Sequence, residues 1–263
     1  MSCPYNTTLS SSSLEPATAL PVWPLVGNAQ RIVGGSLATI SDYPNMVVLL
    51  WSPTGSNHRH DCGGAIIKKS AVLTASHCLY GDSAVNWLIR AGSSFAHSGG
   101  SVHRASELIV HEHYNDRTID NDVAVIRIVD TFNYNRVIQP AKFADSEYAL
   151  GDNEVVWATG WGRLWPNGPV SEQLRQVQIW IVNQEECKQR YARLGYTVTD
   201  NMLCSGYLDV GGRDQCQGDS GGPLYHNGVI VGVSSWGESC ALALYPGVNT
   251  RISRYSSWIE SKA

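Results

Sequence analysis

The sequence of 263 residues has no apolar run near the length of about 20 residues that a membrane-spanning helix requires. It therefore predicts no membrane partner. Charged residues are also few, at 16%, and the net charge of −4 offers no basic surface for nucleic acid. No Cys-x-x-Cys pair occurs, which argues against a zinc ribbon, and we expect neither a metal nor a cofactor.

A signal peptide is not evident in residues 1–31. Pro21 and Pro24 interrupt the only apolar run of this segment, which is otherwise rich in Ser, Thr and Pro. Such a composition cannot bury an apolar core, so we interpret residues 1–31 as a flexible leader or activation segment. Residues 32–263 are then the folded region.

Seven cysteines are present, and six of them fall into local pairs separated by 16, 17 and 24 residues. Regular pairing of this kind is typical of disulfides in a secreted, extracellular protein. Cys3 is left over, as a free or intermolecular thiol. The predicted disulfides are Cys62–Cys78, Cys187–Cys204 and Cys216–Cys240.

The chain is rich in glycine (25) and tryptophan (9), and helical periodicity is scarce, which favours many short strands joined by turns. Asn227-Gly228 predicts a hairpin turn, because both residues tolerate positive φ. The strand candidates form one series before residue 145 and another after it, which suggests two β-barrels of similar size, although the pattern does not separate barrels from sandwiches. The first series is Met46–Trp51, Ala65–Ile67, Ala71–Thr74, Trp87–Ala91, Leu108–His111 and Val123–Val129. The second is Glu154–Thr159, Val177–Val182, Pro223–Tyr225, Val229–Ser234 and Gly247–Arg251.

Two helices are predicted. Asn183-Gln184-Glu185-Glu186 is typical of a capping box that opens a helix toward Leu194, with Gly195 ending it. At the end of the chain, a helical spacing of apolar residues predicts a C-terminal helix with one docked face. The residues with this spacing are Ile252, Tyr255, Trp258 and Ile259.

Three segments carry residues with catalytic chemistry, in the order His77, Asp122, Ser220. Taken singly, a histidine beside a cysteine, an aspartate after asparagine and a serine in a Gly-rich loop are ordinary structural residues. Together they provide a nucleophile, a base that works near neutral pH and an acid that orients the base. The ordered set therefore predicts nucleophilic catalysis.

From Arg31 to its end the chain resembles the trypsin branch of the chymotrypsin-like serine proteases. Five motifs carry the resemblance besides the Asp122 segment: Arg31-Ile32-Val33-Gly34-Gly35, Leu73-Thr74-Ala75-Ser76-His77-Cys78, Thr159-Gly160-Trp161-Gly162, Gly218-Asp219-Ser220-Gly221-Gly222-Pro223 and Ser235-Trp236-Gly237. The resemblance implies an all-β fold of two antiparallel β-barrels of the chymotrypsin type, with a short intermediate helix and a C-terminal helix.

The same resemblance implies the roles in catalysis. Ser220 would attack the substrate carbonyl, His77 would act as general base and acid, and Asp122 would orient His77. The backbone N–H groups of Gly218 and Ser220 would form the oxyanion hole. The expected enzyme is a trypsin-like serine endopeptidase that works through an acyl-enzyme.

Asp214 corresponds to the charge at the base of the specificity pocket, so the expected cleavage is after Arg and Lys. The small residues Gly237 and Gly247 would leave the pocket walls open. Ser235, Trp236 and Gly237 would pair with the substrate backbone.

Four residues depart from the commonest family pattern: Ser76, Gln215, Ser239 and Asn249. Gln215 is larger than the usual Ser or Ala and is expected to change the preference between Arg and Lys. Ser76 in place of Ala is expected to be tolerated.

The resemblance also identifies Arg31–Ile32 as a zymogen cleavage site. Cutting there would free the Ile32 ammonium to pair with Asp219 and order the oxyanion loop. In many vertebrate relatives a loop at the position of residues 92–102 holds calcium. Here it contains no Asp or Glu, so we expect no calcium. His58-x-His60 and His111-x-His113 are expected to be surface histidines.

Arginine outnumbers lysine by 14 to 5. Arginine keeps its charge at alkaline pH, where lysine begins to lose it. With this feature the chain is most similar to the digestive trypsins of insects, lepidopteran larvae in particular, which work in an alkaline gut.

We therefore predict a secreted, monomeric endopeptidase that is made as a zymogen and digests protein. Its expected partners are protein and peptide substrates, and protein protease inhibitors. A narrow processing protease is the alternative within enzymes. A non-catalytic homologue that acts as a binding protein is the alternative outside them, although such homologues usually lack one of the three catalytic residues.

Overall fold

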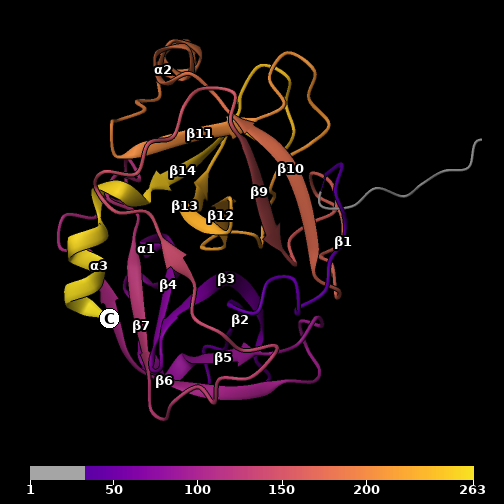
Figure 1. Ribbon diagram of the computed structural model, residues 1–263, viewed down its shortest axis with the longest axis vertical. Helices are drawn as coiled ribbons and strands as arrows, with labels where there is room; N and C mark the ends of the chain where they lie inside the picture. Colours follow the sequence, from indigo (N-terminus) through magenta and orange to yellow (C-terminus); the bar gives the residue numbers. More distant parts are fainter. Residues whose placement is uncertain (1–32) are drawn as a thin grey trace, which may run out of the picture.

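The computed structural model describes residues 33–263. The predicted leader, Cys3, Arg31 and Ile32 lie outside the described residues. Two closed antiparallel barrels of six strands form the fold, as predicted. Figure 1 shows the first barrel in the lower half, in indigo to magenta, and the second above it, in orange to yellow.

The first barrel closes in the order β2-β3-β4-β7-β6-β5. Its interior is apolar, with the fully buried Trp87, Leu49, Ile66 and Ile126 in one cluster. The strands are β2 (Met46–Trp51), β3 (Arg59–Lys68), β4 (Ala71–Thr74), β5 (Trp87–Ala91), β6 (Ser101–Val110) and β7 (Ala124–Ile128).

The second barrel closes because β9 pairs with both β10 and β12. Two short strands add to this sheet: β1 (Ser36–Leu37) pairs with β10, and β8 (Lys142–Phe143) runs parallel to β13. The barrel strands are β9 (Val155–Gly160), β10 (Arg175–Ile181), β11 (Met202–Gly206), β12 (Pro223–His226), β13 (Val229–Trp236) and β14 (Gly247–Arg251).

Both predicted helices are present. In α2 (Gln184–Ala192) the Asn183 side chain accepts a hydrogen bond from Glu186 N at 3.1 Å, which caps the helix. The C-terminal segment forms η2 (Ile252–Arg254) and α3 (Ser256–Lys262), and it buries Ile252, Tyr255 and Ile259. Although it ends the chain, α3 lies beside the first barrel (Figure 1). Two further short helices are α1 (Ser76–Leu79) and η1 (Ala84–Asn86).

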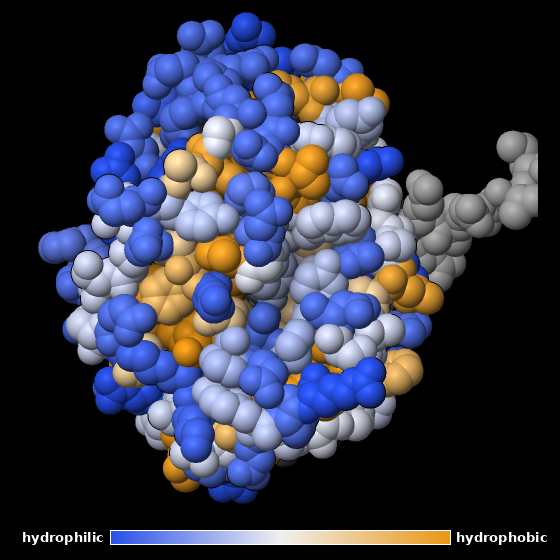
Figure 2. Space-filling model, in the orientation of Figure 1, coloured by the Kyte–Doolittle hydropathy of each residue, from blue (hydrophilic) through white to orange (hydrophobic). Residues whose placement is uncertain are grey.

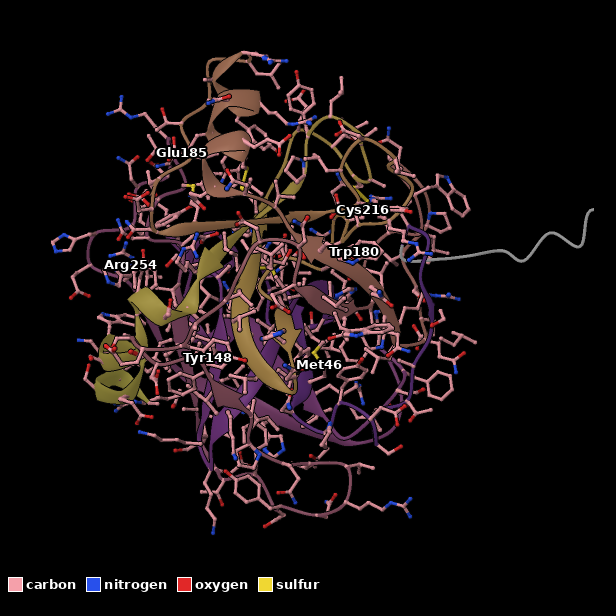
Figure 3. All side chains as sticks on the ribbon, turned by 45° about the horizontal axis from the view of Figure 1, so that its top comes forward. Met46, Tyr148, Trp180, Glu185, Cys216 and Arg254 are labelled. Atoms are coloured by element: carbon pink, nitrogen blue, oxygen red, sulfur yellow. A yellow bond between two sulfur atoms is a disulfide. The ribbon has the colours of Figure 1, made fainter. Side chains whose placement is uncertain are left out.

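The barrels share apolar clusters where they meet. One joins Leu73 and Val125 of the first barrel to Tyr225 and Ile230 of the second. Another joins strand β2 to Trp161, and Met46, labelled in Figure 3, also accepts a hydrogen bond from Thr159 Oγ1 at 3.1 Å. This continuous packing fixes the two barrels relative to each other, as a site built from both requires.

Three disulfides are present, joining Cys62 to Cys78, Cys187 to Cys204, and Cys216 to Cys240. The first two fix α1 and α2 to neighbouring strands, and the third closes a loop of the second barrel. None of the helices in residues 33–263 is long and apolar enough to cross a membrane.

Candidate active site

His77 and Asp122 meet between the barrels. His77 lies on α1, directly after β4, and Asp122 lies just before β7, which pairs with β4. The His77 Nδ1 atom is 2.7 Å from Asp122 Oδ2, and the His77 backbone N–H donates to Oδ1 at 2.8 Å. Burial alone would lower the pKa of His77, but the charge and hydrogen bond of Asp122 outweigh it and raise that pKa.

Asp122 is 1% exposed, and its backbone is held from two sides. Thr250 Oγ1 donates to the Asp122 carbonyl at 2.6 Å, and Ser76 Oγ donates to the Val123 carbonyl at 2.7 Å. Ser235 Oγ donates to the carboxylate itself. From the sequence we expected Ser235 only to pair with the substrate and Ser76 only to be tolerated, so these contacts were missed. All of them join positions far apart in the chain.

Backbone hydrogen bonds hold the Ser220 loop between strands β3 and β13. Its carbonyl accepts from Gly63 N at 2.8 Å, and the next residue, Gly221, donates to the Ser234 carbonyl at 2.8 Å. Because Ser235 bonds to Asp122, strand β13 links the serine loop to the His77–Asp122 pair. The structure thus connects the three predicted catalytic residues through strands of both barrels.

The backbone around Gly218, the predicted oxyanion loop, requires glycine. Gly218 has a φ of +94°, which favours glycine, and a Cβ there would lie 3.1 Å from Gly162 Cα. The Asp219 carboxylate supports this loop by accepting from Gly162 N at 2.8 Å and Cys216 N at 2.9 Å. A Cβ on Gly162 would lie 2.5 Å from Asp219 Cγ, which explains the glycine of that motif.

Asp214 lies at the base of a cavity of about 180 Å³. Ser220 lines the same cavity, so the predicted nucleophile lies beside the pocket. The predicted specificity residues Asp214, Gln215, Ser235, Trp236, Gly237 and Gly247 all line it. Asp214 is 2% exposed, and burial raises its pKa to about 7. Among the described residues, only the backbone N–H groups of Gln215 and Ala241 donate to its carboxylate. A buried carboxylate without a cationic partner is suited to a cationic ligand.

Comparison with known proteins agrees with this geometry. Residues 32–259 match the family described as Trypsin. The chain is 58% identical to "Trypsin, alkaline C" of Manduca sexta over 236 residues, which cover 90% of this chain and 92% of that protein. It is 55% identical to "Trypsin CFT-1" of Choristoneura fumiferana over 234 residues, 89% of this chain and 91% of that protein.

The chain belongs to the trypsin family. It is a trypsin-like serine endopeptidase, and the predicted resemblance to lepidopteran trypsins is confirmed. A further relative, "Achelase-1" of Lonomia achelous, is 50% identical over 236 residues, 88% of this chain and all of that protein.

In this trypsin-family protease, Gln215 and Asn249 form a buried pair under the pocket. Gln215 Nε2 donates to Asn249 Oδ1 at 2.9 Å, and Asn249 Nδ2 is within 3.1 Å of the Leu203 carbonyl and 2.9 Å of Ser205 Oγ. Asn249 is therefore oriented as an acceptor toward Gln215. No donor in the described part of the chain reaches Gln215 Oε1, which leaves an acceptor beside Asp214.

The prediction that the histidine pairs lie at the surface was wrong for two of their members. His111 is buried, because it packs against Tyr255 and Trp258 of the C-terminal segment. His60 lies against the Gly218 backbone, where both ring nitrogens are buried and burial lowers its pKa to about 4. Both rings meet residues distant in sequence, which local spacing does not show.

Among residues 33–263, one group of potential metal ligands comes together, Cys62, His77 and Cys78. The two cysteines are joined in a disulfide, so they offer no thiolate to a metal. The loop at residues 92–102 is held by the Arg90 guanidinium, whose Nε donates to the Ala96 carbonyl at 3.1 Å and whose Nη1 donates to the Gly99 carbonyl.

Proposed function

We propose that this protease is made as a secreted zymogen and cleaves protein chains after Arg and Lys, for protein digestion. The observation that carries the specificity is the buried Asp214 carboxylate at the base of the cavity that Ser220 lines. A substrate guanidinium or ammonium supplies the cation that this carboxylate lacks.

In the proposed mechanism, Ser220 Oγ attacks the scissile carbonyl while His77 Nε2 takes the hydroxyl proton. The carbonyl oxygen becomes an oxyanion and accepts hydrogen bonds from the N–H groups of Gly218 and Ser220. His77 then gives the proton to the leaving amine, and the acyl-enzyme forms as the C–N bond breaks. Water repeats the sequence, with His77 again as base, and releases the acid.

Gln215 is proposed to favour Arg over Lys. Its Oε1 and the Asp214 carboxylate are two acceptors at the pocket base, and the planar guanidinium has five donors to reach both. The shorter lysine side chain carries a compact ammonium, which has fewer donors to share between the two groups.

Activation is proposed to follow cleavage between Arg31 and Ile32. Burial raises the pKa of Asp219 to about 6, and no cationic side chain among the described residues pairs with it. A new Ile32 ammonium would supply that charge. The test compares the cleaved protein with an uncleavable Arg31→Gln chain on a small Arg ester. Equal activity of the two proteins would contradict the zymogen proposal.

Digestion at alkaline pH is supported by the relatives named alkaline trypsins and by the excess of arginine over lysine. A free α-amino group has a pKa near 8, and pairing with Asp219 would raise it. The ion pair therefore stabilises the active form fully below the pKa of the free amine. This stabilisation is lost as pH rises through the raised pKa of the paired amine. Activity should therefore persist above pH 9, and a sharp collapse just above about 8.5, close to the free-amine value, would refute alkaline function.

The substrate assay is the direct test of the proposed activity. After cleavage at Arg31, wild-type protein and a Ser220→Ala variant are compared on Arg, Lys and Phe amides that share one leaving group. We expect turnover in the order Arg, Lys, then Phe, and none with the variant. No turnover by the wild-type protein would instead support a non-catalytic binding protein. Turnover confined to one extended Arg sequence would support a processing protease.

We propose a monomer that protein inhibitors recognise through the same pocket. On the face shown in Figure 2, apolar residues occur in separate patches between hydrophilic ones, which supports a monomer. Sedimentation at micromolar concentration tests this, and a dimer would contradict it.

A further inference from the structure

Asp61 occupies a β-bulge at the edge of the active site. The pairing of β2 with β3 is regular except at one step, where Leu49 lies opposite Cys62 and Leu50 opposite His60. Asp61 is therefore an extra residue with no partner in β2. A bulge of this kind redirects its side chain, and Asp61 is exposed.

The Asp61 carboxylate is close to the catalytic histidine. Asp61 and His77 each directly precede one half of the Cys62–Cys78 disulfide, whose Cα atoms are 6.4 Å apart. The charge of Asp61 adds to that of Asp122 in raising the pKa of His77. The bulge thus places a second carboxylate beside the catalytic centre.

No protein group in the described chain forms a hydrogen bond or an ion pair with the Asp61 carboxylate. Three charged groups act on it: Arg59 on its own strand, His77 on α1 and Asp82 in the loop after α1. Arg59 instead stacks over Trp51, 5.1 Å from the ring centroid. Asp82 is occupied by hydrogen bonds from Trp87 and Asn86. The charge of Asp61 is available to a ligand.

Asp61 lies beside His77, the residue that gives a proton to the leaving amine in the proposed mechanism. His77 protonates that amine, so the chain that follows the scissile bond must pass His77. Strand β3, which carries Asp61, also lies beside Ser220, because Gly63 N donates to the Ser220 carbonyl at 2.8 Å. The Asp214 pocket, lined by Ser235 and Gly237, receives the residue before the bond.

We propose that Asp61 is a specificity residue that binds a Lys or Arg side chain in the first or second residue after the scissile bond. This inference rests on the proposed function. It makes paired basic residues the preferred cleavage sites, with one cation in the Asp214 pocket and the other against Asp61.

The test uses two peptides that share an Arg before the scissile bond and carry Arg or Glu at both positions after it. A small Arg amide, which has no residues after the bond, is measured beside them. Activated wild-type protein is compared with Asp61→Asn, Asp61→Lys and, as a control, Glu147→Gln at another exposed acid. Products are identified by mass so that only the shared bond is scored. The assay is run at pH 9 for every variant, well above the ordinary pKa of histidine, to limit the influence of the Asp61 charge on the protonation of His77.

We expect the ratio of kcat/KM between the Arg and Glu peptides to fall about two- to fivefold in Asp61→Asn, as for a solvent-exposed ion pair, and further in Asp61→Lys. The ratio should also fall with added salt. The Glu147→Gln control and the small amide should be unaffected.

An unchanged peptide ratio in Asp61→Asn overturns the proposal. A loss of small-amide activity in that variant also overturns it, because Asp61 would then support catalysis rather than specificity. If wild-type protein fails on the small amide itself, the proposed function fails, and this inference falls with it.

Discussion

The backbone N–H of Asp214 donates to the carbonyl of Val33 at 3.1 Å. The start of the described chain is thereby bonded to the residue that forms the pocket base. The next residue, Gly34, has a φ of +73°, and a Cβ there would lie 2.7 Å from Arg213 Cγ. The segment that follows the proposed activation site and the specificity pocket therefore form one structural unit.

Gly34→Ala should disturb this unit. The added methyl group collides with the segment at Gly212 and Arg213, and the backbone conformation is strained for alanine. We expect kcat/KM on an Arg amide to fall by at least about tenfold, since a misplaced pocket costs substrate positioning. Gly151→Ala is the matched control, because its Cβ would meet nothing nearer than 3.7 Å. Equal kinetics for both variants would show that the two segments are independent.

The ionisation of Asp214 should govern the affinity for a cation. With a pKa of about 7 in the free protein, the carboxyl is mostly protonated at pH 5. The affinity for an aromatic amidine should therefore rise by about tenfold per pH unit up to pH 7 and then level off. Calorimetry from pH 5 to 9 measures this, with Asp214→Asn as control. A flat profile in wild-type protein would show that Asp214 is ionised throughout.

The same ionisation predicts how stability changes with pH. Because the folded pKa of Asp214 is raised from 3.8, this group stabilises the fold fully below about pH 4 and loses that contribution as pH rises through 7. Urea unfolding measures the free energy of unfolding of wild-type protein and of Asp214→Asn. The free energy of wild-type protein relative to the variant should fall as pH rises from 4 to 7. An unchanged difference from pH 4 to 8 would contradict the burial of an unpaired acid.

Gln215→Ser should lower the preference for Arg. It removes the Oε1 acceptor beside Asp214, so the ratio of kcat/KM between Arg and Lys amides should fall, on the order of tenfold for a hydrogen bond to a charged group. Gln178→Ser, at a half-buried glutamine outside the pocket, is the control. A ratio that stays constant would exclude Gln215 from the choice between the two cations.

Chelation should leave the fold intact. The Arg90 guanidinium holds the loop at residues 92–102 through the carbonyls of Ala96 and Gly99. We expect no change of Tm with a calcium chelator. Arg90→Gln should cost about 1–3 kcal/mol of unfolding free energy, and the exposed Arg104→Gln should cost little. A Tm that drops on chelation would indicate a bound calcium.

Sequence patterns located the strands best where burial alternates or apolar residues run together. Strand β5, Trp87–Ala91, alternates between buried and half-exposed residues, and its predicted bounds are correct. Strand β6 was predicted only from Leu108, although it begins at Ser101, because its first half is mostly polar. Strand β11, Met202–Gly206, was missed because its small Cys, Ser and Gly residues resemble a turn.

The candidate active site was likewise predictable only in part. The family motifs point to His77, Asp122 and Ser220 as continuous segments. The bonds that fix Asp122 join residues 47 and 128 positions apart, from Ser76 to Val123 and from Thr250 to Asp122. Such contacts depend on how the strands pack, and no local pattern encodes them. The packing of His60 against the Gly218 backbone is of this kind too.

The central claim is that the Asp214 carboxylate directs Ser220 to bonds after a cation. The most direct measurement is the ratio of kcat/KM between Arg and Phe amides for activated wild-type protein and for Asp214→Ser. Because the buried carboxylate makes charge-assisted hydrogen bonds to the guanidinium, the ratio should fall by roughly two to four orders of magnitude. A ratio that stays the same would contradict the claim.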